Sequence, residues 1–364
     1  MTYDALILGS GLVGTTLALA LQQMGMKVVL VDAKSRISPE NANDLRTVAL
    51  SLASVKWLQQ TGVWTALTDE EKPAFTNMCI FEPNQSEALT FSAQEAGLPC
   101  LGYMVSHDRL LFKAQSMLTC QTFFDTKLST LEEVNAYDAK YVIGCDGADS
   151  FLRQALGITQ QTHPYGQSAL VAELSSEKWH EHTAFQSFAN GQIMGLLPLH
   201  DPHRLNMVWS LDTDTAKAMM SLPADELNNH IQSMFGNRLG KLAVESRLGM
   251  FPLIARHAHQ YGLGYVVLLG DAIHTVHPLA GQGVNLGFAD AACLTRLILA
   301  GDNNICRTFE RERKLHNFMM MNLMTMLKNS YAKEGLLGNI RRMGIKALNR
   351  LPVIKKLLAT VIST

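Results

Sequence analysis

Three glycines near the N-terminus have the spacing of a nucleotide-binding loop. The apolar run Tyr3–Leu8 predicts a buried strand, and Gly9-x-Gly11-x-x-Gly14 follows it directly. The next residues, TTLALALQQM, predict a helix whose N-terminus offers free N–H groups to a diphosphate. One glycine permits the tight turn, one lets the backbone approach the diphosphate, and one lets helix and strand pack closely. Asp32 ends the following apolar run and would accept hydrogen bonds from ribose hydroxyls. These residues predict a dinucleotide site.

Two later motifs also follow strand-like runs. Asp146-Gly147 comes after the run 141–144, and Asp271 comes at the end of the run 265–270. A carboxylate at a strand end can accept hydrogen bonds from cofactor hydroxyls, and amides at the start of a helix can stabilise an anionic group. Glycines let a ligand approach the backbone without Cβ clashes. The candidate cofactor contacts after Asp271 are Pro278, Gly281, Gly283, Val284 and Asn285.

These three motifs, in this order, resemble those of the class A aromatic flavoprotein monooxygenases, which carry one FAD and no separate nicotinamide domain. The resemblance covers nearly the whole chain and is closest to the ubiquinone-biosynthesis ring hydroxylases. The runs 98–105 and 256–261 look most like the methoxy-methyl-benzoquinol hydroxylase branch. The resemblance implies that Arg46 lies near the flavin and its phosphates, that Arg109 meets the diphosphate, and that Asp146 contacts FAD and NAD(P)H. Each could instead have a structural or surface role.

The resemblance implies a ring hydroxylase. NAD(P)H reduces FAD, dioxygen adds to give a flavin C4a-hydroperoxide, and its distal oxygen passes to a polyprenylated phenol or quinol. We therefore expect FAD as the cofactor, NAD(P)H as the reductant, and no catalytic side chain or metal. His274 and His277 are candidate proton-transfer groups, with packing and hydrogen bonding as the alternative.

The predicted fold is α/β, with a Rossmann-like FAD-binding domain of the p-hydroxybenzoate hydroxylase type interleaved with a mostly antiparallel sheet. We expect the FAD-binding domain to comprise 1–160 and 256–314, the substrate-binding sheet domain 161–255, and a basic helical region 315–364. Aromatic residues of the sheet domain resemble the family's sheet over the flavin, but each could equally belong to an ordinary sheet core. The candidate substrate contacts are Tyr165, Phe185, Phe188, Trp209 and Phe251.

Composition excludes several classes of protein. The 364 residues are 47% hydrophobic and 17% charged, which excludes disorder, and the net charge of −1 lacks the basic surplus of a nucleic-acid binder. No apolar run approaches the roughly 18 residues of a membrane-spanning helix. The N-terminus lacks the basic region of a signal peptide, so we expect a cytoplasmic protein. The six cysteines match no zinc pattern, and we expect no disulfide and no metal.

The C-terminal segment differs in composition from the body. Residues 328–364 contain eight Lys or Arg and one acid, and five methionines fall between 319 and 326. A basic segment with an apolar face predicts contact with a membrane surface. The protein could then associate peripherally with the inner membrane or join a ubiquinone-biosynthesis complex. The alternative is a helix that packs its apolar face on the body and leaves its lysines in solvent.

Two other functions stay open. The segment 110–145 is shorter than the family pattern, in a region that normally contributes backbone to the adenine, so FAD could be bound more weakly. The chain could therefore be a non-catalytic scaffold subunit of the quinone-making complex. It could also be another FAD enzyme of the same fold, although its four tryptophans form no GWxWxIP halogenase motif. Quinol-stimulated NADH oxidation would separate these possibilities.

Overall fold

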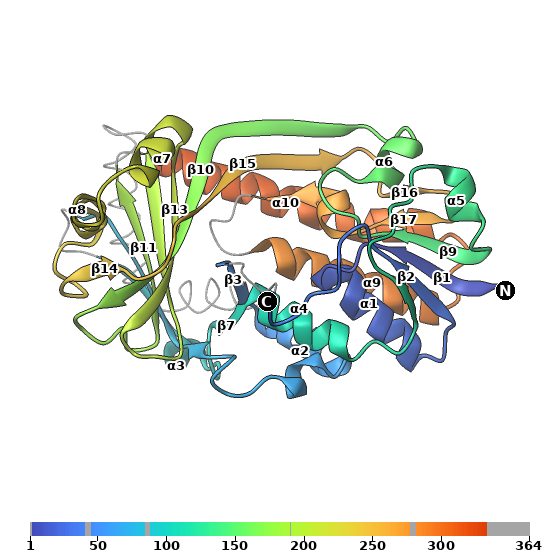
Figure 1. Ribbon diagram of the computed structural model, residues 1–364, viewed down its shortest axis with the longest axis horizontal. Helices are drawn as coiled ribbons and strands as arrows, with labels where there is room; N and C mark the ends of the chain where they lie inside the picture. Colours follow the sequence, from blue (N-terminus) through green and yellow to red (C-terminus); the bar gives the residue numbers. More distant parts are fainter. Residues whose placement is uncertain (1, 41–44, 84–87, 190, 277–281, 333–364) are drawn as a thin grey trace.

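The computed structural model describes residues 2–40, 45–83, 88–189, 191–276 and 282–332. The described chain forms two large sheets, one mostly parallel and one mostly antiparallel. Figure 1 shows them at opposite ends of the long axis, connected by two long strands. The α/β fold predicted from the sequence is confirmed.

The first sheet has the order of an open parallel sheet. Its strands, in spatial order, are β16 (Gly262–Leu263), β17 (Val266–Leu268), β9 (Ala139–Gly144), β1 (Tyr3–Leu8), β2 (Val28–Val31) and β8 (Gln121–Phe123). Neighbours run parallel, except in the β16–β17 hairpin. The last four residues of β1 and all of β2 and β17 are buried, as expected for strands with covered faces.

Helices cover this sheet. The long ones are α1 (Leu12–Gln23), α2 (Leu52–Gln60), α4 (His107–Ser116), α9 (Gln282–Leu299) and α10 (Ile305–Ala332). The short ones are η1 (Val63–Ala66), α5 (Leu131–Asn135), α6 (Phe151–Ala155) and η2 (Gly270–Ala272), whereas α3 (Ala93–Ala96) packs on the second sheet. Side-chain caps fix several starts: Ser51 Oγ accepts from Ser54 N at 3.2 Å, and Thr130 and Glu133 form a capping box. Helix α1 packs against both α4 and α9.

The second sheet is built from strands far apart in sequence. Its path is β18 (His274–Thr275), β15 (Gly249–Ala258), β10 (Gln160–Ser176), β13 (Arg204–Asp212), β12 (Gln192–Pro198), β11 (Thr183–Ala189), β5 (Asn77–Phe81) and β6 (Leu89–Ser92), with β14 (Leu242–Val244) on β10. All pairs are antiparallel except β11–β5. Helices α7 (Thr213–Met220) and α8 (Ala224–Phe235) pack on one face over an apolar core.

Strand β10 is longer than the sequence indicates. Its apolar part, 168–173, is the segment that composition favours as a strand, whereas 160–167 reads QQTHPYGQ and carries no apolar alternation. In the structure this polar half pairs with β15, and the register shifts between Pro164 and Gln167. Pairing with a neighbour across the sheet, rather than local preference, makes this segment a strand.

The boundary between the two sheets does not follow the chain order. Strands β5 and β6 lie within 1–160 but pair into the second sheet, because β5 adds in parallel to the edge of β11. A small third sheet of β3 (Thr47–Leu50), β7 (Gly102–Ser106) and β4 (Ala74–Phe75) flanks this excursion, since β3 and β4 precede β5 in the chain and β7 follows β6. The domain limits expected from the sequence therefore remain a prediction. A division by domain would have to assign β5 and β6 to the second sheet, although they lie within residues 1–160.

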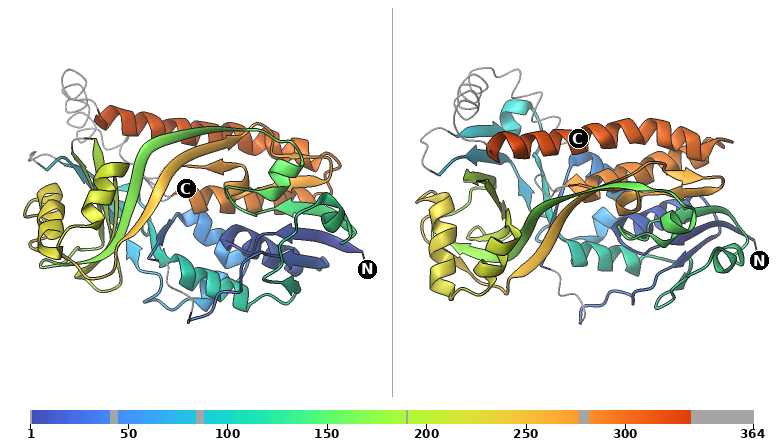
Figure 2. Two further views of the ribbon diagram at one scale, coloured as in Figure 1. Left: turned by 45° about the horizontal axis from the view of Figure 1, so that its top comes forward. Right: turned by 90° about the horizontal axis from the view of Figure 1, so that it is seen from above.

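Helix α10 is the longest helix of the described chain. It packs on α9 and β16, and in Figure 2 it extends along the long axis of the molecule. Among the residues that the structure describes, no helix combines the length and the apolar character needed to cross a bilayer. The C-terminal residues from 333 onward, which carry most of the basic segment, lie outside the described residues.

Candidate cofactor groove and active site

A groove of about 770 Å³ opens along the carboxyl ends of the parallel strands, within the size range of ligand sites. Its lining includes the residues that directly follow β1, β2, β9 and β17, where open α/β sheets bind their ligands. Helix α4 forms part of one side. The groove-lining residues at these four strand ends are Gly9 to Val13, Asp32 to Ser35, Cys145 to Gly147 and Leu269 to Asp271.

The three glycines of the first loop have different roles in the structure. Gly9 has a φ of +99°, and a β-carbon there would lie 2.2 Å from the carbonyl oxygen of Cys145. A β-carbon at Gly14 would lie 2.0 Å from the carbonyl oxygen of Gly9. Both glycines are therefore required by the fold. A β-carbon at Gly11, the N-cap of α1, would meet no described atom within 4 Å, so the backbone there is open to the groove. This is the cradle that a diphosphate requires.

Asp32 is held in a fixed orientation at the end of β2. Its Oδ2 accepts from the Ser10 hydroxyl at 2.8 Å and also from the Ser10 amide, and its Oδ1 accepts from Lys34 N at 2.7 Å. Buried Gln115 of α4 donates to the Ser10 carbonyl at 2.9 Å from the other side. The carboxylate is thereby presented at the groove wall, where the sequence predicts a ribose contact.

Asp146 follows β9 and uses only one of its carboxylate oxygens within the described chain. Its Oδ2 accepts from Leu152 N at 3.2 Å, whereas Oδ1 is buried and has no hydrogen-bond partner among the described residues. Gly147 turns the chain with a φ of +86°. Because a buried carboxylate oxygen is costly when unpaired, Oδ1 is suited to accept a hydrogen bond from a ligand hydroxyl. Asp146 and Gly147 both line the groove, as expected.

Asp271 extends the groove at the end of β17. Asp271 lines the groove and reaches solvent through the groove opening, while protein surrounds its carboxyl on the other sides. The surrounding protein raises the pKa of this carboxyl above its ordinary value by burial, and His274, Arg46 and Arg256 oppose that shift. Gly283 and Val284 line the same region, and a β-carbon at Gly283 would meet no described atom within 4 Å.

The remaining predictions for this segment divide into two groups. His277, Pro278 and Gly281 lie outside the described residues. The Asn285 side chain accepts from Ser51 N at 3.1 Å and Ser54 Oγ at 2.6 Å, and donates to a carbonyl of β3 at 2.9 Å. These contacts tie α9 to the start of α2. The structure therefore gives the Asn285 side chain a supporting position, and it is not among the described residues that line the groove.

The two arginines expected at the cofactor differ in placement. Arg46 lines the groove, and its guanidinium lies 5.6 Å from the centre of the Phe251 ring. Arg109 pairs with Glu71, is 48% exposed, and is not among the described residues of the lining. Helix α4 presents residues 107, 108, 111 and 115 to the groove. Position 109 is rotated about 200° from position 107 on a helix of 3.6 residues per turn, which explains its outward direction.

His274 is fully buried beside the groove. Its Nε2 lies 2.6 Å from Asp290 Oδ2, and both side chains are inaccessible to solvent. The imidazole does not line the groove within the part of the chain described. The geometry therefore favours the alternative considered from the sequence, in which His274 packs and forms hydrogen bonds.

The predicted substrate residues lie on both faces of the second sheet. Cross-strand register connects Phe251 through β10, β13 and β12 to Phe188, so these two rings share one face, and Arg46 contacts that face. Trp209 and Phe185 alternate onto the other face, in the core under α7 and α8. Their placement does not support substrate contacts, because strand alternation directs them away from the cofactor side. Tyr165 lies at the β10 irregularity, with its ring edge on His163.

Comparison with known proteins identifies the relatives of this chain. The FAD binding domain family matches residues 2–321. Ubiquinone hydroxylase UbiL of Rhodospirillum rubrum is 30% identical over 97% of this chain and 88% of its own length. The 3-demethoxyubiquinol 3-hydroxylase of Escherichia coli is 29% identical over 96% of this chain and 95% of its own. The chain belongs to the FAD-dependent ubiquinone hydroxylase family.

Solved structures of the same fold agree with this assignment. p-Nitrophenol 4-monooxygenase PnpA of Pseudomonas putida covers 100% of this chain with 98% of its own, at a TM-score of 0.79 and 15% identity. PqsL of Pseudomonas aeruginosa, a probable FAD-dependent monooxygenase, gives a TM-score of 0.76 at 21% identity, with 95% and 100% coverage. At these identities the similarity shows the fold.

The groove fits the FAD of this family. The open backbone at Gly11 suits the diphosphate, and the held carboxylate of Asp32 suits the adenosine ribose. The Asp146 oxygen that lacks a partner in the described chain suits a further hydroxyl. FAD supplies the electron transfer and oxygen chemistry of a monooxygenase when bound. The residues that line the groove would hold and orient it, and the sheet face that carries Phe188 and Phe251 lies beside Arg46.

Two buried polar residues that lie in or beside the groove were not predicted from the sequence. Gln115 lines the groove and is buried, although it lies in a helical segment that otherwise looks ordinary. Asp290 is fully buried between apolar positions of α9. The available signal was a polar residue on the apolar side of a predicted helix, which costs free energy unless a specific partner is present. The partners, 105 and 16 residues away, cannot be read locally.

Proposed function

We propose that this protein hydroxylates the aromatic ring of a polyprenylated phenol or quinol intermediate of ubiquinone biosynthesis, with NAD(P)H as reductant and O2 as oxidant. The observation that carries the proposal is the near-full-length similarity to curated ubiquinone hydroxylases, in a chain whose groove is lined by the glycine loop and by Asp32, Asp146 and Asp271. The aromatic residues on the cofactor side of the second sheet support a flat, apolar ring substrate.

The proposal is tested with purified protein loaded with FAD. A short-chain prenylated quinol analogue should stimulate NAD(P)H oxidation, and mass spectrometry should find the ring with one added oxygen atom, labelled when 18O2 is supplied. Oxidation of NAD(P)H that yields only hydrogen peroxide with every analogue would contradict it. A protein that remains colourless in excess FAD would instead favour the scaffold alternative.

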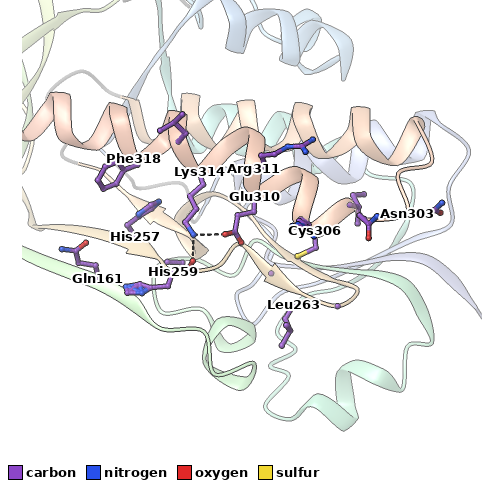
Figure 3. Close-up of a pocket in the computed structure, with 17 residues that line it drawn as sticks. Gln161, His257, His259, Leu263, Asn303, Cys306, Glu310, Arg311, Lys314 and Phe318 are labelled. Carbon is purple, nitrogen blue, oxygen red and sulfur yellow. Dashed lines mark hydrogen bonds and ion pairs between the residues drawn. The ribbon is translucent and has the colours of Figure 1, made fainter.

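We further propose that the protein acts in the cytoplasm, bound peripherally to an anionic membrane surface where such a substrate dissolves. The basic C-terminal composition supports this, and so does a groove of about 1,070 Å³ between α10 and the β15–β16 region. Leu315, Phe318 and Leu263 on its walls are 64%, 48% and 52% exposed. Figure 3 shows Phe318 on α10 and Leu263 across the groove.

Two exposed arginines lie beside these apolar groups. Arg307 and Arg311 are on successive turns of α10 and have no ion pair among the described residues. Lys314, by contrast, pairs with Glu310 at 2.8 Å (Figure 3). Exposed apolar side chains next to exposed cations are typical of surfaces that bind anionic lipid, because burial and counter-charge act together.

Vesicle sedimentation tests the membrane proposal separately from catalysis. The protein should bind vesicles containing anionic phosphatidylglycerol more strongly than neutral phosphatidylcholine vesicles, and R307E/R311E should remove that difference. A matched double charge reversal of exposed lysines on other surfaces, K56E/K241E, should retain it. Equal binding to both vesicle types, or none, would refute the membrane proposal. Unchanged binding by R307E/R311E would exclude the groove as its site.

A further inference from the structure

A single buried carboxylate joins three elements beside the cofactor groove. Asp290 of α9 is inaccessible to solvent, and its Oδ2 accepts from His274 Nε2 at 2.6 Å and from Gly270 N at 3.3 Å. Its Oδ1 accepts from Arg313 Nε at 2.7 Å and Asn317 Nδ2 at 3.3 Å, both on α10. Four donors from η2, β18 and α10 therefore meet at one side chain.

The junction keeps Asp290 ionised. Burial alone would raise the pKa of this carboxyl, but His274 and Arg313 outweigh burial and hold the pKa below its ordinary value. Arg313 is the permanent countercharge, and its Nη2 also donates to Leu286 O at 3.4 Å and to Asn317 Oδ1 at 3.0 Å. A buried charge with this many partners has a defined geometry, and removing either member of the pair leaves the other uncompensated.

Asp290 fixes both ends of the turn that carries Asp271. Gly270 precedes that residue and His274 follows it by three positions, and both donate to the same carboxylate oxygen. Gly270 and Asp271 line the cofactor groove, whereas Asp290 lies behind it. The position of the groove wall therefore depends on a residue that does not touch the groove.

The junction also selects a tautomer of His274. Nε2 carries the hydrogen that is donated to Asp290, because the carboxylate can only accept. Nδ1 is buried and has no hydrogen-bond partner among the described residues. A hydrogen on Nδ1 would thus be buried and unsatisfied, which disfavours that form.

The polar chain continues away from the groove but does not form a proton path. Asn317 Nδ2 also donates to Tyr261 OH at 3.3 Å, and Tyr261 OH lies 2.9 Å from His257 Nε2. His257 lines the α10 groove of Figure 3, next to Phe318. Because an amide N–H is not readily lost or gained, Asn317 interrupts proton transfer between Asp290 and Tyr261. The chain is therefore a mechanical connection between α10 and the turn at Asp271.

We propose that Asp290 is a positioning residue for FAD: it holds the Gly270–His274 turn and the Nε2–H form of His274 in place, and thereby connects α10 to the cofactor groove. The proposal rests on the FAD site of the family and is independent of which ring is hydroxylated. Its test uses FAD affinity and the state of an imidazole, so a wrong substrate assignment would leave it standing.

The first experiment compares the full-length protein with Asp290→Asn, which has the same shape but no charge. The dissociation constant of FAD, from flavin fluorescence, should rise about ten-fold or more, the size expected when charge-assisted hydrogen bonds are lost. Selective 15N-histidine NMR of the FAD-loaded wild type, assigned with His274→Gln, should show His274 with its hydrogen on Nε2. In Asp290→Asn that signal should shift. Asp225→Asn, an exposed carboxylate on α8, should change neither quantity.

A second variant separates positioning from stability. Asp290→Asn/Arg313→Met removes both charges, so the uncompensated Arg313 charge no longer lowers the melting temperature. Positioning predicts that the double variant unfolds near the wild-type temperature, yet still binds FAD about ten-fold more weakly. Recovery of FAD affinity to within about two-fold of wild type would overturn the proposal and make the pair purely structural. A wild-type His274 with its hydrogen on Nδ1 would overturn it as well, whatever the variants do.

Discussion

Gly11 and Gly14 lie three residues apart but differ in what a β-carbon would meet. At Gly14 it would lie 2.0 Å from a backbone carbonyl oxygen, and at Gly11 it would meet no described atom within 4 Å. Gly11→Ala should therefore leave the protein without FAD about as stable as wild type while weakening FAD binding. Gly14→Ala should destabilise the fold itself, because α1 must move away from the loop.

The magnitudes follow from these contacts. In Gly11→Ala, the loss of a favourable glycine N-cap destabilises the fold by about 0.5–1 kcal/mol. The alanine also lowers the conformational entropy of the unfolded chain, which stabilises the fold by about 0.4–1 kcal/mol, so the two effects offset each other. A methyl group at the diphosphate would remove at least one charge-assisted hydrogen bond, about 1.5–3 kcal/mol or ten-fold or more in the dissociation constant. At Gly14, overpacking against backbone costs about 1–3 kcal/mol or more.

Thermal and chemical unfolding with and without FAD measures both effects. With FAD at about 100 times the wild-type dissociation constant, the stabilisation of about 2.7 kcal/mol should fall to about 1.4 kcal/mol or less in Gly11→Ala. Gly195→Ala is the matched control, since its β-carbon meets only ordinary contacts at 3.8 Å and beyond. If Gly11→Ala binds FAD as tightly as wild type, the diphosphate does not lie over this loop and the groove assignment is refuted.

Three further outcomes follow from side-chain placement. Arg46→Ala should raise the FAD dissociation constant several-fold in a fluorescence titration, whereas Arg109→Ala should leave it within about two-fold, because Arg109 pairs with Glu71 outside the groove. Phe251→Ala should raise the quinol KM without lowering the melting temperature. Trp209→Phe should instead lower the free energy of unfolding by about 1–2 kcal/mol and leave the KM unchanged. Burial lowers the pKa of His257 to about 4, so the unfolded chain binds more protons, and the free energy of unfolding falls as pH drops from about 6.5 to about 4. In pH-dependent urea denaturation, His257→Gln should lack that part of the fall.

Local signals predicted which strand-end residues the structure brings together in one groove. The glycine loop, Asp32, Asp146 and Asp271 all follow buried strands, and the ends of parallel strands converge on one edge of a sheet. The location of these residues thus depends on strand order alone. The aromatic substrate residues were harder, because alternation along a strand assigns two faces but does not say which one meets the cofactor. Trp209 and Phe185 went to the α7–α8 core for that reason.

Positions fixed by distant partners could not be predicted. The expected role of Arg109 depended on the rotation of α4, which is set by the contacts of the apolar side of that helix and by buried Gln115. Asp290 received no role from the sequence, because its partners are 16 to 27 residues away on other elements. The excursion of β5 into the second sheet likewise arises from pairing with β11, a contact between residues about a hundred positions apart.

The structure also bears on the choice between an enzyme and a scaffold. The short segment 110–145 still contributes β8 to the sheet and Gln115, Thr126 and Lys127 to the groove lining, so this part of the groove retains a wall. Gly9 and Gly14 would be needed by any protein with this fold, ligand or not. Gly11 and the Asp146 oxygen without a partner in the described ranges are different, since packing does not require the first and burial penalises the second. A bound dinucleotide accounts for both features, whereas a scaffold without a cofactor accounts for neither.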